Sequence, residues 1–182
     1  MTQGRKPMSR IAALPSRLVV MAVLAALVAG WAGPVAARTN AAHQRLQVKR
    51  MVIEEARRMR FPVALALAVA HAESNFDATA RSHKGARGVM QIMPATSIGE
   101  YGIDPELLWR PGLNIRMGIH FLGRLIRRYR GRTDLALSYY NGGSAVGAPG
   151  RARVLPATYG YVRKVRSLRR RYMRELLTGA VR

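Results

Sequence analysis

An uninterrupted apolar stretch is the feature that most limits how this chain can fold. From Pro62 to Ala72 every residue except His71 is apolar, and the stretch ends at Glu73. A helix of this composition has no polar face, so the rest of the chain must cover it nearly all round. The sequence therefore predicts a buried central helix that carries a carboxyl group at its end.

The position of Glu73 has a chemical consequence. A carboxyl group at the edge of an apolar core loses solvation, which raises its pKa and lets it hold a proton near neutral pH. Such a group can serve as a general acid. A solvated charge is the commoner role for a glutamate at a helix end, so Glu73 taken alone does not indicate catalysis.

The remaining sequence predicts further helices and no sheet. The clearest signal covers residues 114–129, where Ile115, Ile119 and Leu122 recur at helical spacing on one face. Helices are also predicted over 41–60, 94–101, 135–140 and from 159 onward. The predicted fold class is mainly α, with a single domain.

The connecting segments carry their own predictions. Residues 82–88 are typical of turns, and Val89–Ile92 is expected to form a short extended piece beside the end of the Glu73 helix. Thr133 or Asp134 is expected to cap the helix that follows. Glycine and proline mark residues 141–156 as a loop.

The first 37 residues have the pattern of an export signal. Four basic residues precede residue 18, no charge occurs over 18–37, and small residues at 35–37 suit signal peptidase. We expect cleavage after Ala37, which leaves 38–182 as the domain. An uncleaved membrane anchor is the alternative, but Gly30, Gly33 and Pro34 interrupt the apolar run, and a span needs about 20 apolar residues.

The charge of the chain is strongly positive. It contains 31 basic and nine acidic residues, and removal of residues 1–37 takes away four basic and no acidic ones, which leaves a formal charge of +18. Such an excess indicates a polyanionic partner. Because the export signal argues against nucleic acid, we expect a periplasmic or cell-wall-associated protein that binds an anionic wall polymer or membrane in a salt-dependent way.

Cysteine is absent, so the protein forms no disulfides and cannot be a lipoprotein with a stable membrane anchor. The four histidines, His43, His71, His83 and His120, show no metal-ligand spacing. We therefore expect no metal or other cofactor, and we interpret His71 as a packing residue on a different helix face from Glu73.

Four separated blocks change the interpretation of Glu73. They are ESNF at 73–76, GVMQIMP at 88–94, YNG at 140–142 and the segment 158–162. Together they resemble the catalytic domain of soluble lytic transglycosylases (SLT), a lysozyme-like α fold that acts on peptidoglycan. The resemblance covers about residues 52–165, and its order and spacing are far more specific than any single glutamate.

The resemblance implies a role for eight residues. Glu73 would be the catalytic acid and base, and Tyr161 would point its hydroxyl towards it. The residues implied to form the sugar-binding site are Ser74, Gly88, Met90, Gln91, Tyr140, Asn141 and Tyr161. From the residue types alone, Gln91 could instead satisfy backbone groups in a turn, and the two tyrosines could be ordinary core aromatics.

A second carboxylate is missing from the four blocks. Most glycosidases use two, but the other acids here are expected in a turn, at a helix cap or, as for Glu54, Glu55 and Glu100, on solvated faces. An N-acetylated sugar can supply its own acetamido oxygen instead. We therefore expect non-hydrolytic cleavage of peptidoglycan glycan strands that forms 1,6-anhydro ends. A hydrolytic muramidase and a non-enzymatic cationic wall-binding or envelope assembly protein are the alternatives.

Overall fold

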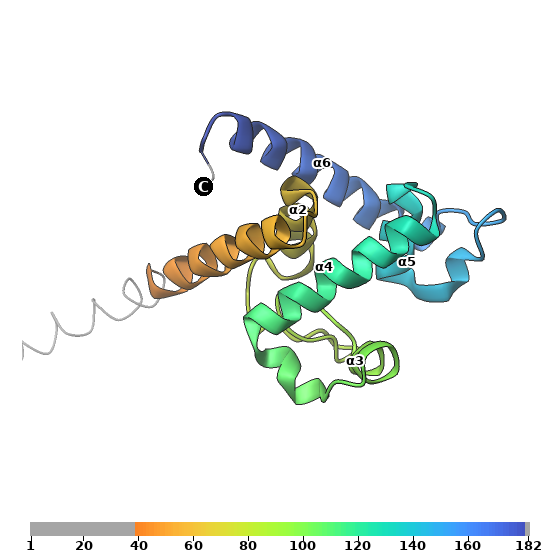
Figure 1. Cartoon of the computed structure of the whole chain (residues 1–182), viewed down its shortest axis with the longest axis horizontal. Coiled ribbons are helices and arrows are strands. Elements are labelled where there is room, and N and C mark those ends of the chain that lie inside the picture. Colours follow the sequence, from red (N-terminus) through yellow and green to blue (C-terminus); the bar gives the residue numbers. More distant parts are fainter. Residues whose placement is uncertain (1–38, 181–182) are drawn as a thin grey trace, which may run out of the picture. The chain divides into compact units, whose positions relative to one another are not determined.

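The computed structural model describes residues 39–180 (Figure 1). The segment 39–58 is helical. The α-helices that follow are α2 (Val63–Ser74), α3 (Pro94–Tyr101), α4 (Pro111–Arg128), α5 (Thr133–Gly142) and α6 (Tyr159–Leu177). Short 3-10 turns form η1 (Pro105–Trp109), η2 (Gly143–Val146) and η3 (Pro156–Thr158).

The predicted mainly α class is confirmed. Residues 39–180 contain no β-strand, and the only extended pairing in them is a pair of isolated bridges that join Arg87 to Arg81 and to Ile92. Ala42–Arg182 is one compact unit, and Met1–Ala41 is assigned to another. The predicted export signal over 1–37 lies outside the described residues. Over the described range, no helix combines the length and apolarity needed to cross a bilayer.

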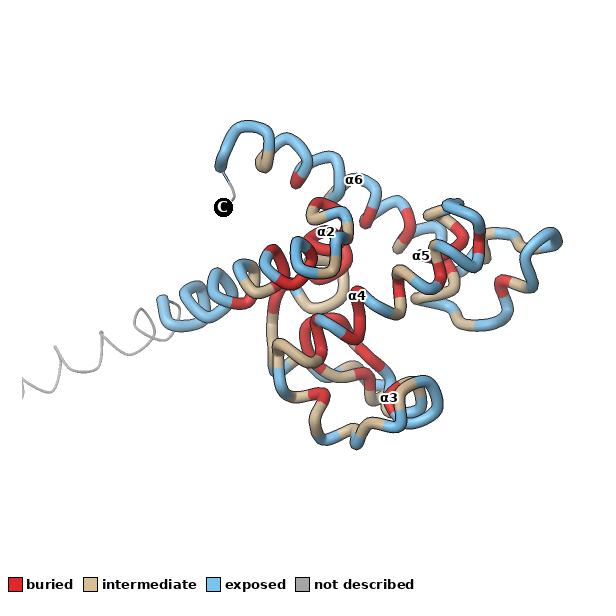
Figure 2. Tube along the Cα trace, viewed as in Figure 1, coloured by how far each residue is buried: buried red, intermediate tan, exposed pale blue. Residues whose placement is uncertain are grey.

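Helix α2 is the centre of the hydrophobic core. Every residue from Ala64 to Ala70 is buried, with at most 2% of its surface exposed, as a helix without a polar face requires. Helix α6 packs against α2. Figure 2 shows buried positions around α2 and along α4, whereas much of α6 is exposed.

Helix α4 contributes the second large apolar face. Ile115, Ile119 and Leu122 are buried, and the helix packs against α5 and η1. It begins at Pro111, three residues earlier than predicted, because proline fits the first turn of a helix, where its missing N–H costs nothing. Gly131 then takes a left-handed conformation, with φ 82°, and its N–H donates to the Ile126 carbonyl, which reverses the chain.

The prediction of an extended piece over Val89–Ile92 is wrong. Residues 88–91 form a turn in which Gly88 and Gln91 both have positive φ, at 72° and 47°. Residue Ile92 then pairs back with Arg87 through two backbone hydrogen bonds. The apolar residues of this turn face the core because the chain folds back on itself, not because it alternates as a strand does.

Two predictions about α5 are also wrong. Arg132 precedes the first helical residue, no side chain caps that end, and the Thr133 hydroxyl donates instead to the Gly131 carbonyl at 3.3 Å. The helix continues to Gly142 and is followed at once by η2, so the predicted loop over 141–156 is partly helical. Glycine-rich sequence indicated a loop here, but packing of α5 against α4 and α6 extends the helix.

Candidate active site

Glu73 lies in the last turn of α2, where the buried part of the helix ends. Burial raises the pKa of its carboxyl group to about 7, and the Tyr161 hydrogen bond and the charge of Lys164 act in the opposite direction. The Lys164 ammonium is held close by, since it donates to the Ala72 carbonyl at 2.8 Å. A carboxyl with this pKa can both release and accept a proton near neutral pH.

Tyr161, in the first turn of α6, is the direct partner of Glu73. Its hydroxyl donates a 2.6 Å hydrogen bond to Glu73 Oε1. Burial, with a further contribution from the charge of Glu73, raises the pKa of Tyr161 well above its ordinary value, so the phenol remains a donor. Glu73 Oε2 has no hydrogen-bond partner within residues 39–180, which leaves that oxygen to carry the acidic proton.

Buried hydroxyl groups fix the beginning of α6 and so the place of Tyr161. Thr158, which is 2% exposed, lies 2.7 Å from the Ser138 hydroxyl on α5 and donates to the Leu155 carbonyl at 2.9 Å. The Leu155 N–H donates to Ser138 Oγ at 3.0 Å. This role of Ser138 was not predicted from the sequence, although a hydroxyl between the apolar positions of a short helix was a usable signal.

Asn114 holds the turn over residues 87–90 from α4. Its side chain is fully buried; Oδ1 accepts from the Met90 N–H at 2.7 Å, and Nδ2 donates to the carbonyls of Arg87 at 2.8 Å and Leu108 at 3.1 Å. A Cβ atom on Gly88 would lie 2.6 Å from Nδ2, so both the positive φ and the close approach require glycine. This role of Asn114 was not predicted from the sequence; the available signal was a polar residue in the same helical row as Gly118 and Leu122.

Tyr140 ties this turn to α5. Its hydroxyl donates to the Met90 carbonyl at 2.8 Å, and the fully buried Met90 side chain packs directly over Gly118 of α4. Burial raises the pKa of Tyr140 well above its ordinary value, and the charge of Glu73 adds to the shift. Tyr140, Tyr161 and Glu73 therefore form one electrostatically connected group.

The other implied sugar-site residues differ in what they contact. Ser74 donates to the Val89 carbonyl at 2.9 Å and so joins the end of α2 to the turn. The Gln91 amide donates to the Ala80 and Gly88 carbonyls, at 3.0 and 2.9 Å, and thus satisfies backbone groups of its own segment. Asn141 is exposed at the end of α5 and makes no side-chain hydrogen bond to residues 39–180.

No second carboxyl acts on Glu73. Burial raises its pKa, the Tyr161 hydrogen bond and the Lys164 charge lower it, and no acidic side chain contributes. Each of the other acids except the exposed Glu54 is engaged elsewhere, by a basic side chain or by groups of its own turn: Glu55, Asp77, Glu100, Asp104, Glu106, Asp134 and Glu175. The described residues contain no group of three or more histidine, cysteine or acidic side chains that could hold a metal ion.

Two of the acids predicted on solvated faces are paired. Glu55 is only 5% exposed, because the helical segment 39–58 turns it towards α4, where Arg116 Nε lies 2.7 Å from Oε1. Glu100 pairs with Arg124 at 2.7 Å but remains at the surface. The prediction of solvation is therefore wrong for Glu55.

His71 packs against the aromatic residues of α6 and of the turn after α2. Its Nδ1 lies 2.6 Å from the Tyr172 hydroxyl, and its ring centroid lies 5.6 Å from that of Phe76. Burial lowers its pKa, and nearby cations, Arg171 first among them, lower it further. A neutral imidazole fits this packing role.

Tyr161→Phe is expected to lower the activity of this site about 10- to 100-fold, because a hydrogen bond to an ionisable carboxyl is worth about 1.5–3 kcal/mol and each step of about 1.4 kcal/mol is a factor of ten in rate. The lost bond holds the pKa of Glu73 down, so the alkaline limb of the pH–rate profile should move to higher pH. The measurement is a pH–rate profile of the reaction catalysed at this site. Tyr159→Phe, in the same turn but 51% exposed, is the control, and an unmoved limb in Tyr161→Phe would count against the pairing.

The helical fold and a single proton-holding carboxyl at the end of its central helix define the lysozyme-like class. The model of the Transglycosylase SLT domain matches residues 50–151, so this chain belongs to the transglycosylase SLT domain family.

Solved structures agree with this assignment. An inactive mutant of lytic transglycosylase Slt from Pseudomonas aeruginosa, in which glutamine replaces a glutamate, is 26% identical, with a TM-score of 0.59 over 70% of this chain. The 70 kDa soluble lytic transglycosylase from Escherichia coli is 27% identical, with a TM-score of 0.52 over 62%. A complex of the 70 kDa enzyme with bulgecin A, at 24% identity and a TM-score of 0.58, shows the same fold. The chain spans about a quarter of each of these proteins, 24%, 22% and 24% of their lengths.

Proposed function

We propose that this protein is a peptidoglycan lytic transglycosylase, which cleaves the β-1,4 bond between N-acetylmuramic acid and N-acetylglucosamine without water. The observation that carries the proposal is one half-buried carboxyl at the end of the core helix, Glu73, whose pKa burial raises to about 7 and on which no second carboxylate acts. Two-carboxylate mechanisms need a second acid within several ångströms. The names of the similar proteins support the same reaction class.

In the first step, protonated Glu73 donates its proton to the oxygen that links the two sugars. Tyr161 holds Oε1, so Oε2 is the oxygen that presents the proton. As the bond breaks, the 2-acetamido oxygen of the muramic residue stabilises the positive charge at its anomeric carbon. The N-acetylglucosamine side leaves as a neutral alcohol.

In the second step, the carboxylate formed at Glu73 takes the proton of the C6 hydroxyl on the same muramic residue. The C6 oxygen then bonds to the anomeric carbon and displaces the acetamido oxygen, which closes the 1,6-anhydro ring. Glu73 ends protonated, ready for the next cycle. A group that acts first as acid and then as base works best with a pKa near the operating pH.

The expected place of action is the cell wall. The predicted export signal and the formal charge of +22 for the full chain both favour an envelope protein that works on an anionic polymer. We expect the protein to be periplasmic or wall-associated, with glycan strands as its substrate.

Mass spectrometry of the products tests the reaction. Purified peptidoglycan treated with the protein is expected to yield muropeptides ending in 1,6-anhydro-N-acetylmuramic acid, each lighter by one water than the reducing form. Reducing ends without anhydro ends would show a muramidase instead. Binding without any soluble product, under conditions where a lytic enzyme of the family digests the same wall, would show a non-enzymatic wall-binding protein.

A further inference from the structure

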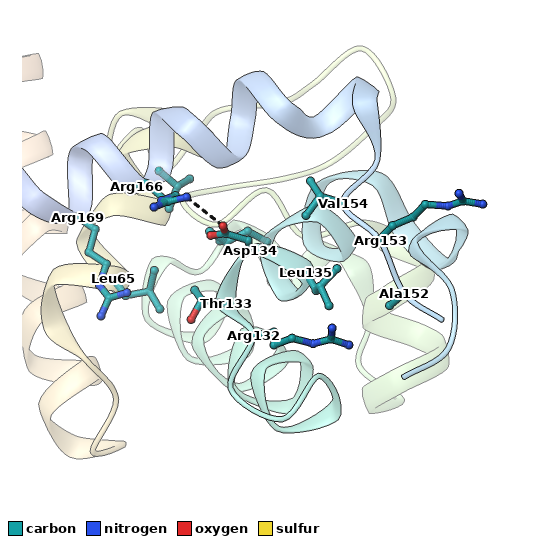
Figure 3. A pocket seen from close by; sticks show the side chains of 12 residues that line it. Leu65, Arg132, Thr133, Asp134, Leu135, Ala152, Arg153, Val154, Arg166 and Arg169 are labelled. Atoms are coloured by element: carbon teal, nitrogen blue, oxygen red, sulfur yellow. Dashed lines mark hydrogen bonds and ion pairs between the residues drawn. The ribbon is translucent and has the colours of Figure 1, made fainter. Parts of the chain in front are cut away.

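A pocket of about 630 Å³ lies on a different part of the domain from Glu73. It is bounded by the start of α5, the segment 152–154, α6 and Leu65 of α2, and Figure 3 shows the side chains that line it. Leu65 precedes Glu73 by eight residues, about 12 Å along the helix axis. Neither Glu73 nor any of the seven residues implied for the sugar site lines this pocket.

The walls of the pocket are positively charged. Arg166 and Arg169 line it from α6, and Arg132 lines it from the position just before α5. Arg153 contributes from the loop, with its side chain pointing away from the others (Figure 3). One acid, Asp134, accepts from Arg166 at 3.1 Å. In the part of the chain that the structure describes, Arg132 and Arg169 have no ion-pair partner. The pocket therefore holds uncompensated positive charge that a ligand carboxylate could neutralise.

The floor of the pocket is apolar. The floor is defined as the apolar residues of the lining, which are Leu65, Leu135, Leu137, Ala152, Val154 and Val165. Free phosphate or a sugar-phosphate chain offers nothing to such a floor, whereas short aliphatic side chains do. The volume also lies within the range of small-ligand sites, roughly 300–1,000 Å³.

We propose that this pocket binds short acidic peptides, with carboxylates at Arg132, Arg166 and Arg169 and small aliphatic side chains on the apolar floor. Alanine-rich peptides with free carboxylates have this chemistry, and the stem peptides of peptidoglycan are the natural source; that last identification rests on the proposed function. Binding here would hold a wall strand against the domain at a second point, independent of the chemistry at Glu73.

The first test is a titration of the isotopically labelled protein with N-acetyl-Ala-Glu-Ala, followed by amide NMR shifts at low salt. We expect shifts at Thr133, Asp134 and Val154 and none at the residues around Glu73. The neutral amide analogue N-acetyl-Ala-Gln-Ala-NH2 should bind more weakly. Shifts confined to the Glu73 region, or equal affinity for the neutral analogue, would overturn the proposal.

The second test separates a built site from diffuse charge. The double variant Arg132→Gln with Arg169→Gln should raise the dissociation constant for the acidic peptide by about tenfold or more. A tenfold rise corresponds to about 1.4 kcal/mol of binding free energy. The double variant Arg50→Gln with Arg57→Gln removes the same charge from exposed positions of the helical segment 39–58. It should change the dissociation constant less than about threefold. Equal weakening in both double variants would overturn the proposal.

Competition with inorganic phosphate distinguishes a peptide site from a general anion site. If phosphate displaced the peptide at a lower concentration than the peptide itself needs to bind, the assignment to an acidic peptide would be wrong. Glu73→Gln should leave peptide binding unchanged, because Glu73 does not line this pocket. Failure of the proposed reaction and failure of this site are thus separate results.

Discussion

Glu73→Gln is expected to lower the rate of peptidoglycan cleavage by at least about 10³-fold. General acid–base catalysis contributes roughly 10²–10⁴-fold, and here one carboxyl would act in both steps, so the loss should lie in the upper part of that range. Glutamine keeps the shape and can still accept the Tyr161 hydrogen bond, but it has no acidic proton. Release of soluble muropeptides from purified peptidoglycan gives the rate.

A control variant and a binding measurement are needed to interpret that loss of activity. Glu54→Gln removes a charge from an exposed acid without an ion pair and should keep the parental rate. Near-parental activity of Glu73→Gln would show that another group supplies the proton. Binding of the variant to peptidoglycan should persist, because the basic surface is unchanged.

The same substitution should alter how the free energy of unfolding depends on pH. The urea transition that measures this effect also reports whether the variant is folded. In the folded protein the pKa of Glu73 is raised from 4.5 to about 7, so between these values the native state holds more protons than the unfolded state. The free energy of unfolding should therefore fall as pH rises through this window, by about 1.4 kcal/mol per pH unit at most. Urea melts at pH 5 and pH 8 should show a smaller decrease in Glu73→Gln than in the parent.

Asn114→Ala is expected to lower the free energy of unfolding by about 3 kcal/mol or more. Two backbone groups lose their partner, the Met90 N–H and the Leu108 carbonyl. The Arg87 carbonyl loses one of its two donors and keeps the Ile92 N–H. Each buried polar group left without a hydrogen bond costs about 1–3 kcal/mol, and water entering the vacated space recovers part of that. Equilibrium urea denaturation gives the value.

The matched control for this change is Asn141→Ala. Asn141 is exposed and its side chain bonds to no residue in 39–180, so its loss should change stability by no more than about 0.5 kcal/mol. A loss below about 1 kcal/mol for Asn114→Ala would mean that the turn over 87–90 is held mainly by other contacts. Activity should fall together with stability, because Tyr140 and Ser74 both bond to that turn.

The helices and the acid could be predicted because local sequence determines them. The run before Glu73 is apolar at every helical position but one, so it fits only a covered helix, and the raised pKa follows from where that helix ends. Helix α4 was predicted from its apolar periodicity, and only its first residues were missed.

The turn beside Glu73 could not be predicted in the same way. Gln91 takes a positive φ that its residue type does not favour, and contacts distant in sequence impose it. Asn114 lies 24 residues from Met90, and nothing in the spacing of the sequence indicates that the two meet. Glu55 was assigned to solvent because its partner Arg116 comes from a helix 61 residues further along the chain.

Side chains from α2, α4 and α5 hold the main chain of the turn over residues 87–91. Ser74, Asn114 and Tyr140 all bond to its backbone carbonyls and N–H groups. These bonds depend on the backbone path of the turn, and Gln91 adds two more from its own side chain. Met93, just after the turn and 38% exposed, takes no part in them through its side chain, so a substitution there should leave the acid in place.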